Sequence, residues 1–120
     1  MVSVQTWLIV DAVMDDFIAV EVQSLGDEKA VAHAQALRQR GWDAARAHPL
    51  NGQGPAGWPP IDAVLPIDLG QSDVTFVREQ LDDAAVVTRQ LLGDERFQGL
   101  AREEQEEGLQ GIAQARAELG

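Results

Sequence analysis

The sequence predicts an α+β fold, with a small mixed sheet followed by a C-terminal helical region. Apolar side chains occupy both faces of residues 4–14, which is typical of an interior strand. Residues 17–48 have the pattern strand, helix, strand. From Ser72 onward, apolar residues recur at spacings of three and four, which is typical of amphipathic helices. A chain of 120 residues suits one domain with a modest core, so we expect a single domain over residues 1–120.

The first two strands are expected to form a β-hairpin. Residues 4–14 would pair antiparallel with residues 17–25, whose polar and apolar side chains partly alternate. Asp15 and Asp16 lie between these segments. Aspartate is favoured in tight turns because its side chain bonds the nearby backbone. The pattern therefore predicts a turn at these two residues.

A helix and a third strand are expected next. Asp27 is a suitable N-cap, and apolar residues follow at helical spacing. Gly41 would end this helix, because glycine readily adopts the left-handed conformation of a helix stop. Residues 42–48 would then form a strand parallel to the second one. The hairpin and β-α-β core over residues 1–48 resembles ferredoxin-like domains in outline, which implies an architecture and assigns no function.

A Gly/Pro loop is expected at residues 49–60. Its three glycines and four prolines exclude a helix or a central strand. Trp58 within this loop has three interpretations: it folds back onto the core, it serves recognition, or it belongs to a disordered segment. Residues 61–70 are expected to form a short edge strand and a turn, since Pro66 removes a backbone donor.

Residues 72–119 are expected to be helical. Gly93 would end one helix and Asp94 would cap the next. Apolar residues within 74–92 cover more than one side of the first helix. We therefore expect a homodimer with the C-terminal helices in its interface.

The charge is strongly acidic. Twenty acidic and nine basic residues give a net charge of −11, which argues against direct nucleic acid binding and is compatible with a basic protein partner. The sequence contains no cysteine, and no apolar run has the length of a membrane span or a signal peptide. These observations predict a cytoplasmic protein. Eight arginines against one lysine indicate a bacterial source with a GC-rich genome.

Candidate site residues are few, and no catalytic residue, metal site or cofactor is predicted. No histidine lies four residues from His33, so the helical zinc pattern is missing. His48 lies at the end of a predicted strand beside the Gly/Pro loop. Asp62 and Asp68 flank the predicted edge strand and could approach each other. With Trp58, these three residues are the candidates for binding a ligand or partner.

Two classes of function follow, and the first is favoured. The chain would be a non-catalytic binding or regulatory protein that engages a macromolecular partner through its acidic helical half or through the Trp58 loop. Alternatively, it would bind a small molecule, with or without catalysis, in a pocket between sheet and helices. That pocket would be lined by Trp7, Trp42, Trp58, His48, Asp62 and Asp68. A purely structural subunit is a third class that the sequence does not separate from the first.

Overall fold

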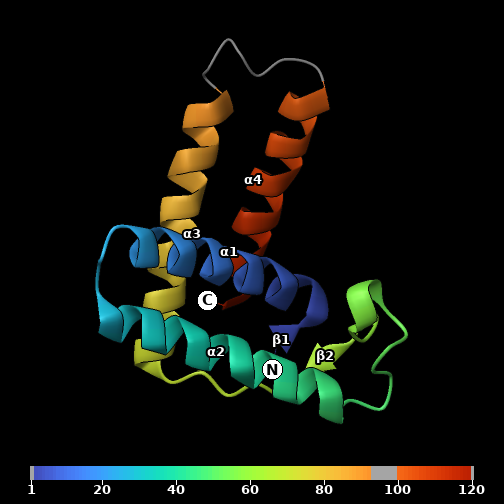
Figure 1. Ribbon diagram of the computed structural model, residues 1–120. Helices are drawn as coiled ribbons and strands as arrows, with labels where there is room; N and C mark the ends of the chain where they lie inside the picture. Colours follow the sequence, from blue (N-terminus) through green and yellow to red (C-terminus); the bar gives the residue numbers. More distant parts are fainter. Residues whose placement is uncertain (1, 93–99, 120) are drawn as a thin grey trace.

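The computed structural model describes residues 2–92 and 100–119, and the side chains of residues 2–90 and 103–119. Figure 1 shows two antiparallel helix pairs, α1 with α2 and α3 with α4, that cross each other. The elements are β1 (Val2–Ser3), α1 (Val4–Gln23), α2 (Glu28–Ala47), the 3-10 turn η1 (Pro55–Gly57), β2 (Val64–Leu65), α3 (Gln71–Leu92) and α4 (Leu100–Leu119). Within the described residues, no helix combines the length and apolar character needed to cross a membrane.

The predicted α+β fold class, with its ferredoxin-like mixed sheet, is wrong, because the described chain is mostly helical. Its only strands are β1 and β2, which pair antiparallel with Val2 opposite Leu65. Residues 4–14 form the first half of α1 and not a strand. This helix is apolar on more than one side because it contacts α2, α3 and α4. Its buried apolar side chains follow helical spacing: Val4, Trp7, Val10 and Met14.

The predicted β-hairpin is also wrong, because α1 continues through Asp15 and Asp16. Asp15 joins α1 to α2, since its carboxylate accepts a hydrogen bond from Arg38 at 3.0 Å. Asp11, one turn earlier, accepts a second hydrogen bond from Arg38 at 3.0 Å. The acidic residues that suggested a turn therefore hold two helices together.

Gly41 does not end α2, and the predicted strand at residues 42–48 is wrong. A Cβ atom placed on Gly41 would lie 1.7 Å from Nε1 of Trp7. Glycine therefore allows α1 and α2 to approach closely, and it does not reverse the chain here. The predicted N-cap is present: the carboxylate of Asp27 accepts a hydrogen bond from the backbone N–H of Lys29 at 2.9 Å.

The C-terminal helices α3 and α4 pack against each other, and α1 lies across one end of the pair (Figure 1). An ion pair links α4 to α3, with Arg116 Nε 2.5 Å from Asp82 Oδ1. The predicted break between the helices at Gly93 and Asp94 lies outside the described residues. The buried side chains of α3 and α4 include Val77, Leu81, Ala85, Ile112 and Ala115.

The end of α4 also holds the start of α1. The carboxylate of Glu118 accepts hydrogen bonds from the backbone N–H of Ser3 at 2.7 Å, from its hydroxyl at 2.9 Å and from the hydroxyl of Thr6. Burial would raise the pKa of Glu118, but the hydrogen bonds from Thr6 and Ser3 outweigh it and lower that pKa. A carboxylate at this position is also favoured by the positive end of the α1 dipole.

Candidate functional site

The Gly/Pro loop after α2 is held by its own hydrogen bonds. The backbone N–H of Gly54 donates to the carbonyl oxygen of Trp58 at 2.7 Å, and that of Gly52 donates to Gly57 at 3.0 Å. The Trp58 side chain is half-buried and packs against the core. Of the three interpretations of this residue, folding back onto the core describes its position. The exposed part of the Trp58 indole lies at the surface of a hollow.

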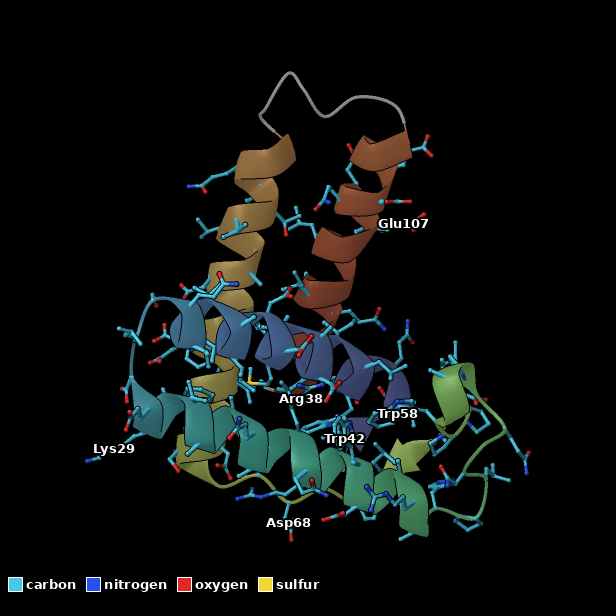
Figure 2. All side chains as sticks on the ribbon, in the orientation of Figure 1. Lys29, Arg38, Trp42, Trp58, Asp68 and Glu107 are labelled. Carbon is cyan, nitrogen blue, oxygen red and sulfur yellow. The ribbon has the colours of Figure 1, made fainter. Side chains whose placement is uncertain are left out.

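This hollow lies between the C-terminal half of α2 and the loop and measures about 310 Å³. We call it the tryptophan hollow. Trp42 comes from α2 and is 38% exposed, while Trp58 comes from the loop. Figure 2 labels Trp42 and Trp58 on the side of α2 that leads to the loop, and both residues line this hollow. The complete lining is Trp42, Ala45, Arg46, Asn51, Ala56, Gly57 and Trp58.

Two arginines border these indoles. The Arg38 guanidinium carbon lies 5.1 Å from the Trp42 ring centroid, in cation–π geometry. The hydrogen bond to Asp11, which outweighs the opposing effect of burial, raises the pKa of Arg38. Arg46 is 69% exposed, with its guanidinium 4.0 Å from Asp43. This weak surface pair leaves Arg46 accessible to an anionic group of a ligand.

The backbone of the hollow contains one strained residue. Ala56 has a φ of 53° in the left-handed region, and Gly57 follows with a φ of 84°. Glycine adopts such angles freely, but a non-glycine residue there costs roughly 1–3 kcal/mol. Strained residues of this kind cluster at binding sites and switch regions. Ala56 therefore marks the lining of the tryptophan hollow as a candidate functional surface.

The predicted site residues are distributed over several places. Trp7 is fully buried with its Nε1 against Gly41, and it does not line the tryptophan hollow. His48 stabilises the loop, since its Nδ1 accepts a hydrogen bond from the backbone N–H of Leu50 at 3.0 Å. Asp62 is exposed after the loop. Of the predicted binding residues, the hollow therefore contains Trp58 and, from the alternative pocket, Trp42.

Asp68 lines a second hollow of about 510 Å³ on another side of α2. Its carbonyl oxygen accepts a long hydrogen bond from Arg40 at 3.4 Å. Figure 2 shows Asp68 below α2, away from the two labelled tryptophans. The lining is Arg40, Asp43, Ala44, Pro66, Ile67 and Asp68. It contains no aromatic residue, and the guanidinium of Arg40 is already bound to Asp73 at 2.8 Å.

A polar cluster of His33, Arg40 and the buried Asp73 joins α2 to α3. The Asp73 carboxylate lies 2.7 Å from His33 Nε2 and 2.8 Å from the Arg40 guanidinium, and it accepts from the backbone N–H of Gly70 at 3.1 Å. Burial would raise its pKa, but these hydrogen bonds outweigh burial and lower the pKa to about 2. Phe76 stacks on the His33 ring. No sequence signal connects His33 with Asp73, which lies 40 positions later.

The chemistry of the tryptophan hollow is that of binding. Its side chains offer indole faces, one guanidinium and one carboxamide, and these groups include no nucleophile with an adjacent base. Among the described residues, no group of three or more histidine, aspartate or glutamate side chains could hold a metal ion. Comparison with protein-family models, with curated proteins and with solved structures finds no match to this chain.

Proposed function

We propose that this chain is a non-catalytic binding protein that holds a segment of a macromolecular partner in the tryptophan hollow. The observation that carries the proposal is the pair of indoles that line one hollow with Arg46, where Trp42 and Arg46 come from α2 and Trp58 comes from a loop held by its own hydrogen bonds. Tryptophan and arginine are enriched among the residues that dominate binding energy in protein interfaces. A loop ordered before binding loses less conformational entropy when the partner arrives.

The shape of the hollow favours a macromolecular segment over a small molecule. Its volume of about 310 Å³ is at the lower limit of small-molecule pockets, which span roughly 300–1,000 Å³ and enclose most of their ligand. The tryptophan hollow is shallow and open to solvent, and the Arg46 side chain in its lining is exposed. An open site of this size suits one or two side chains that project from a larger partner.

The acidic helical half is the second proposed binding surface, and none of the contacts between described residues distinguishes it as a site. Glu103, Glu104 and Glu107 are exposed on α4, and a basic partner would meet them there. The homodimer through the C-terminal helices stays a prediction. Of the apolar side chains that motivated it, Val77 and Leu81 are buried within one chain, whereas Val86 and Val87 are exposed. Self-association through α3 and α4 would therefore use the exposed side of the apolar stripe.

Affinity capture with matched variants tests the proposal. The purified chain is immobilised, exposed to a bacterial lysate, and compared with Trp42→Ala and Arg46→Ala. Val87→Ala is the control, because Val87 is an exposed apolar residue on α3 that lies outside the hollow. We expect proteins retained by the wild-type chain and the control to be lost from both hollow variants, as quantified by mass spectrometry.

The salt dependence of capture distinguishes the two surfaces. Binding through the indoles should persist at moderate salt, whereas binding through the glutamates of α4 should weaken steeply. Equal retention by wild type and both hollow variants would contradict the proposal. If no protein is retained, but a metabolite changes the fluorescence of the wild-type chain and not that of Trp42→Ala, the site binds a small molecule instead.

A further inference from the structure

The second hollow, which Asp68 lines, lies on the other flank of α2 from the tryptophan hollow and measures about 510 Å³. Its lining includes Ala44 of α2, whereas the tryptophan hollow includes Trp42. Two positions along a helix turn the side chain to the far flank, roughly 160° away. Figure 2 accordingly shows Asp68 below α2, away from the two labelled tryptophans. The same part of α2 therefore has a hollow on each side.

The segment after β2, which forms part of this lining, is held before any partner binds. The backbone N–H of Ile67 donates to the carbonyl oxygen of Leu65 at 2.9 Å, and Leu65 pairs with Val2 in the sheet. The guanidinium of Arg40 donates to the carbonyl oxygen of Asp68 at 3.4 Å. A lining that is ordered in advance loses less conformational entropy on binding.

Arg40 also lines the second hollow, but its charge is already compensated. Its guanidinium lies 2.8 Å from the carboxylate of Asp73. An anionic ligand would compete with Asp73 and would be repelled by Asp43 and Asp68, which belong to the same lining. The charges around the second hollow therefore favour a cation.

Both aspartates of the lining can accept further contacts. Within the described part of the chain, the carboxylate of Asp68 has no hydrogen bond or ion pair. Asp43 is 62% exposed, and its Oδ1 accepts a hydrogen bond from Gln39 at 2.9 Å and lies 4.0 Å from Arg46. These contacts involve one oxygen of Asp43, and an exposed pair at this distance is weak. A cation can therefore approach both carboxylates.

The remaining lining of the second hollow is apolar and consists of Ala44, Pro66 and Ile67. Lysine and arginine side chains bury an aliphatic stem on such a surface while the charged head stays in a polar environment. A bare metal ion would make no use of the apolar surface, and no group of three or more carboxylates or histidines among the described residues could hold one. The combination fits a basic side chain.

We propose that the second hollow binds a lysine or arginine side chain of the macromolecular partner, with the stem against Ile67 and the cation beside Asp43 and Asp68. The cation comes from a protein and not from a free polyamine, because Asp43 also approaches Arg46, which lines the tryptophan hollow. One partner surface that crosses this exposed part of α2 can cover both hollows. The inference rests on the proposed function and specifies the charge of the partner, which the net charge of −11 would attract from a distance.

An NMR titration of the isotope-labelled full chain with pentalysine tests the site. We expect the backbone amide signals of Ala44, Ile67 and Asp68 to shift. Asp68→Asn should weaken this binding by about threefold, the size expected for one exposed ion pair. Asp62→Asn is the matched control, because Asp62 also follows a Pro-Ile pair but is exposed outside the hollow, and it should bind as wild type. Circular dichroism checks that both variants are folded.

Three results of this titration would overturn the inference. Shifts confined to α4 would place the cation at Glu103, Glu104 and Glu107. Equal weakening by Asp68→Asn and Asp62→Asn would show an effect of net charge alone. Spermidine that binds at the same amides as tightly as pentalysine would assign the hollow to a free polyamine.

Capture from the lysate separates this inference from the proposed function. The expected result is that capture of the same proteins is reduced in both Asp68→Asn and Trp42→Ala and is unchanged in Asp62→Asn. Capture that is reduced in Trp42→Ala alone overturns the inference and leaves the tryptophan hollow standing. Capture that is reduced in Asp68→Asn alone overturns the proposed function and leaves the cation site standing.

Discussion

Removing the charge of Asp73 should destabilise the protein at neutral pH and have much less effect in acid. The Asp73 carboxylate is 12% exposed and is held by His33, Arg40 and the backbone of Gly70. Asp73→Asn keeps the shape of the side chain but loses its negative charge. We therefore expect a lower free energy of unfolding for Asp73→Asn than for wild type, with a difference that depends on pH.

The pKa shift of Asp73 determines the magnitude. Its pKa falls from 3.8 to about 2 on folding, and each pKa unit corresponds to about 1.4 kcal/mol. Because the folded pKa is the lower one, the ionised carboxylate stabilises the fold fully above the unfolded pKa, by about 2 kcal/mol. As the pH falls this stabilisation is lost, so that about half remains at pH ~3 and little at pH ~2.

Urea unfolding followed by circular dichroism at 222 nm measures the difference. Wild type and Asp73→Asn are compared at pH values from neutral to about 2, so that effects of other carboxylates largely cancel. Asp83→Asn is the matched control, because Asp83 is exposed on the same helix. The free energy of unfolding of Asp83→Asn should differ from that of wild type by no more than about 0.5 kcal/mol. A difference in the free energy of unfolding between wild type and Asp73→Asn that is the same at every pH would refute the reasoning.

Three further substitutions have expected outcomes. Gly41→Ala should destabilise the fold by about 1–3 kcal/mol or more, because its Cβ would lie 1.7 Å from Nε1 of Trp7, and thermal unfolding should show a lower Tm. Leu25→Gly should raise the Tm by a few degrees, since Leu25 has a φ of 55° and glycine relieves a left-handed strain of about 1 kcal/mol. Glu118→Gln should lower the free energy of unfolding by about 1 kcal/mol at pH ~7, and by less in acid, because the folded pKa of Glu118 is lowered. Denaturant titrations at two pH values measure the loss of stability in Glu118→Gln. An equal loss in the free energy of unfolding at both pH values would contradict this expectation.

Local signals were enough to predict several parts of this fold. Asp27 caps α2 through amides two and three positions away, and the spacing from Ser72 onward predicts the helical character of α3. The irregular loop at residues 49–60 follows from its prolines and glycines. In each case the residues that determine the structure lie within a few positions of one another, so the sequence pattern contains the information.

The first half of α1 shows why the predicted sheet failed. A helix packed between other helices is apolar on more than one side, and over about ten residues it has the composition of an interior strand. Helical signals were nevertheless present in the spacing of Val4, Trp7 and Val10. A further signal was Ser3, whose hydroxyl accepts the backbone N–H of Thr6 at 3.2 Å. The presence of apolar residues on both faces of residues 4–14 outweighed these signals in the prediction.

The remaining errors depended on contacts between distant residues. Gly41 has the local appearance of a helix stop, and only its contact with Trp7, 34 positions earlier, shows that it permits close packing. The pairing of His33 with Asp73 spans 40 positions. Asp62 and Asp68 were candidates because the end of a larger sheet would bring them together, whereas the structure has the two-residue strand β2 between them and places Asp68 in the second hollow.

The continuation of α2 through Gly41 also determines where the chain can bind. A helix stop at this position would have placed Trp42 on a strand within a sheet, facing a closed layer. Because the helix continues, Trp42 lies on its flank beside the loop that carries Trp58, and the two indoles form an open surface. The close contact between Gly41 and Trp7 therefore stabilises the fold and also supports the position of the tryptophan hollow.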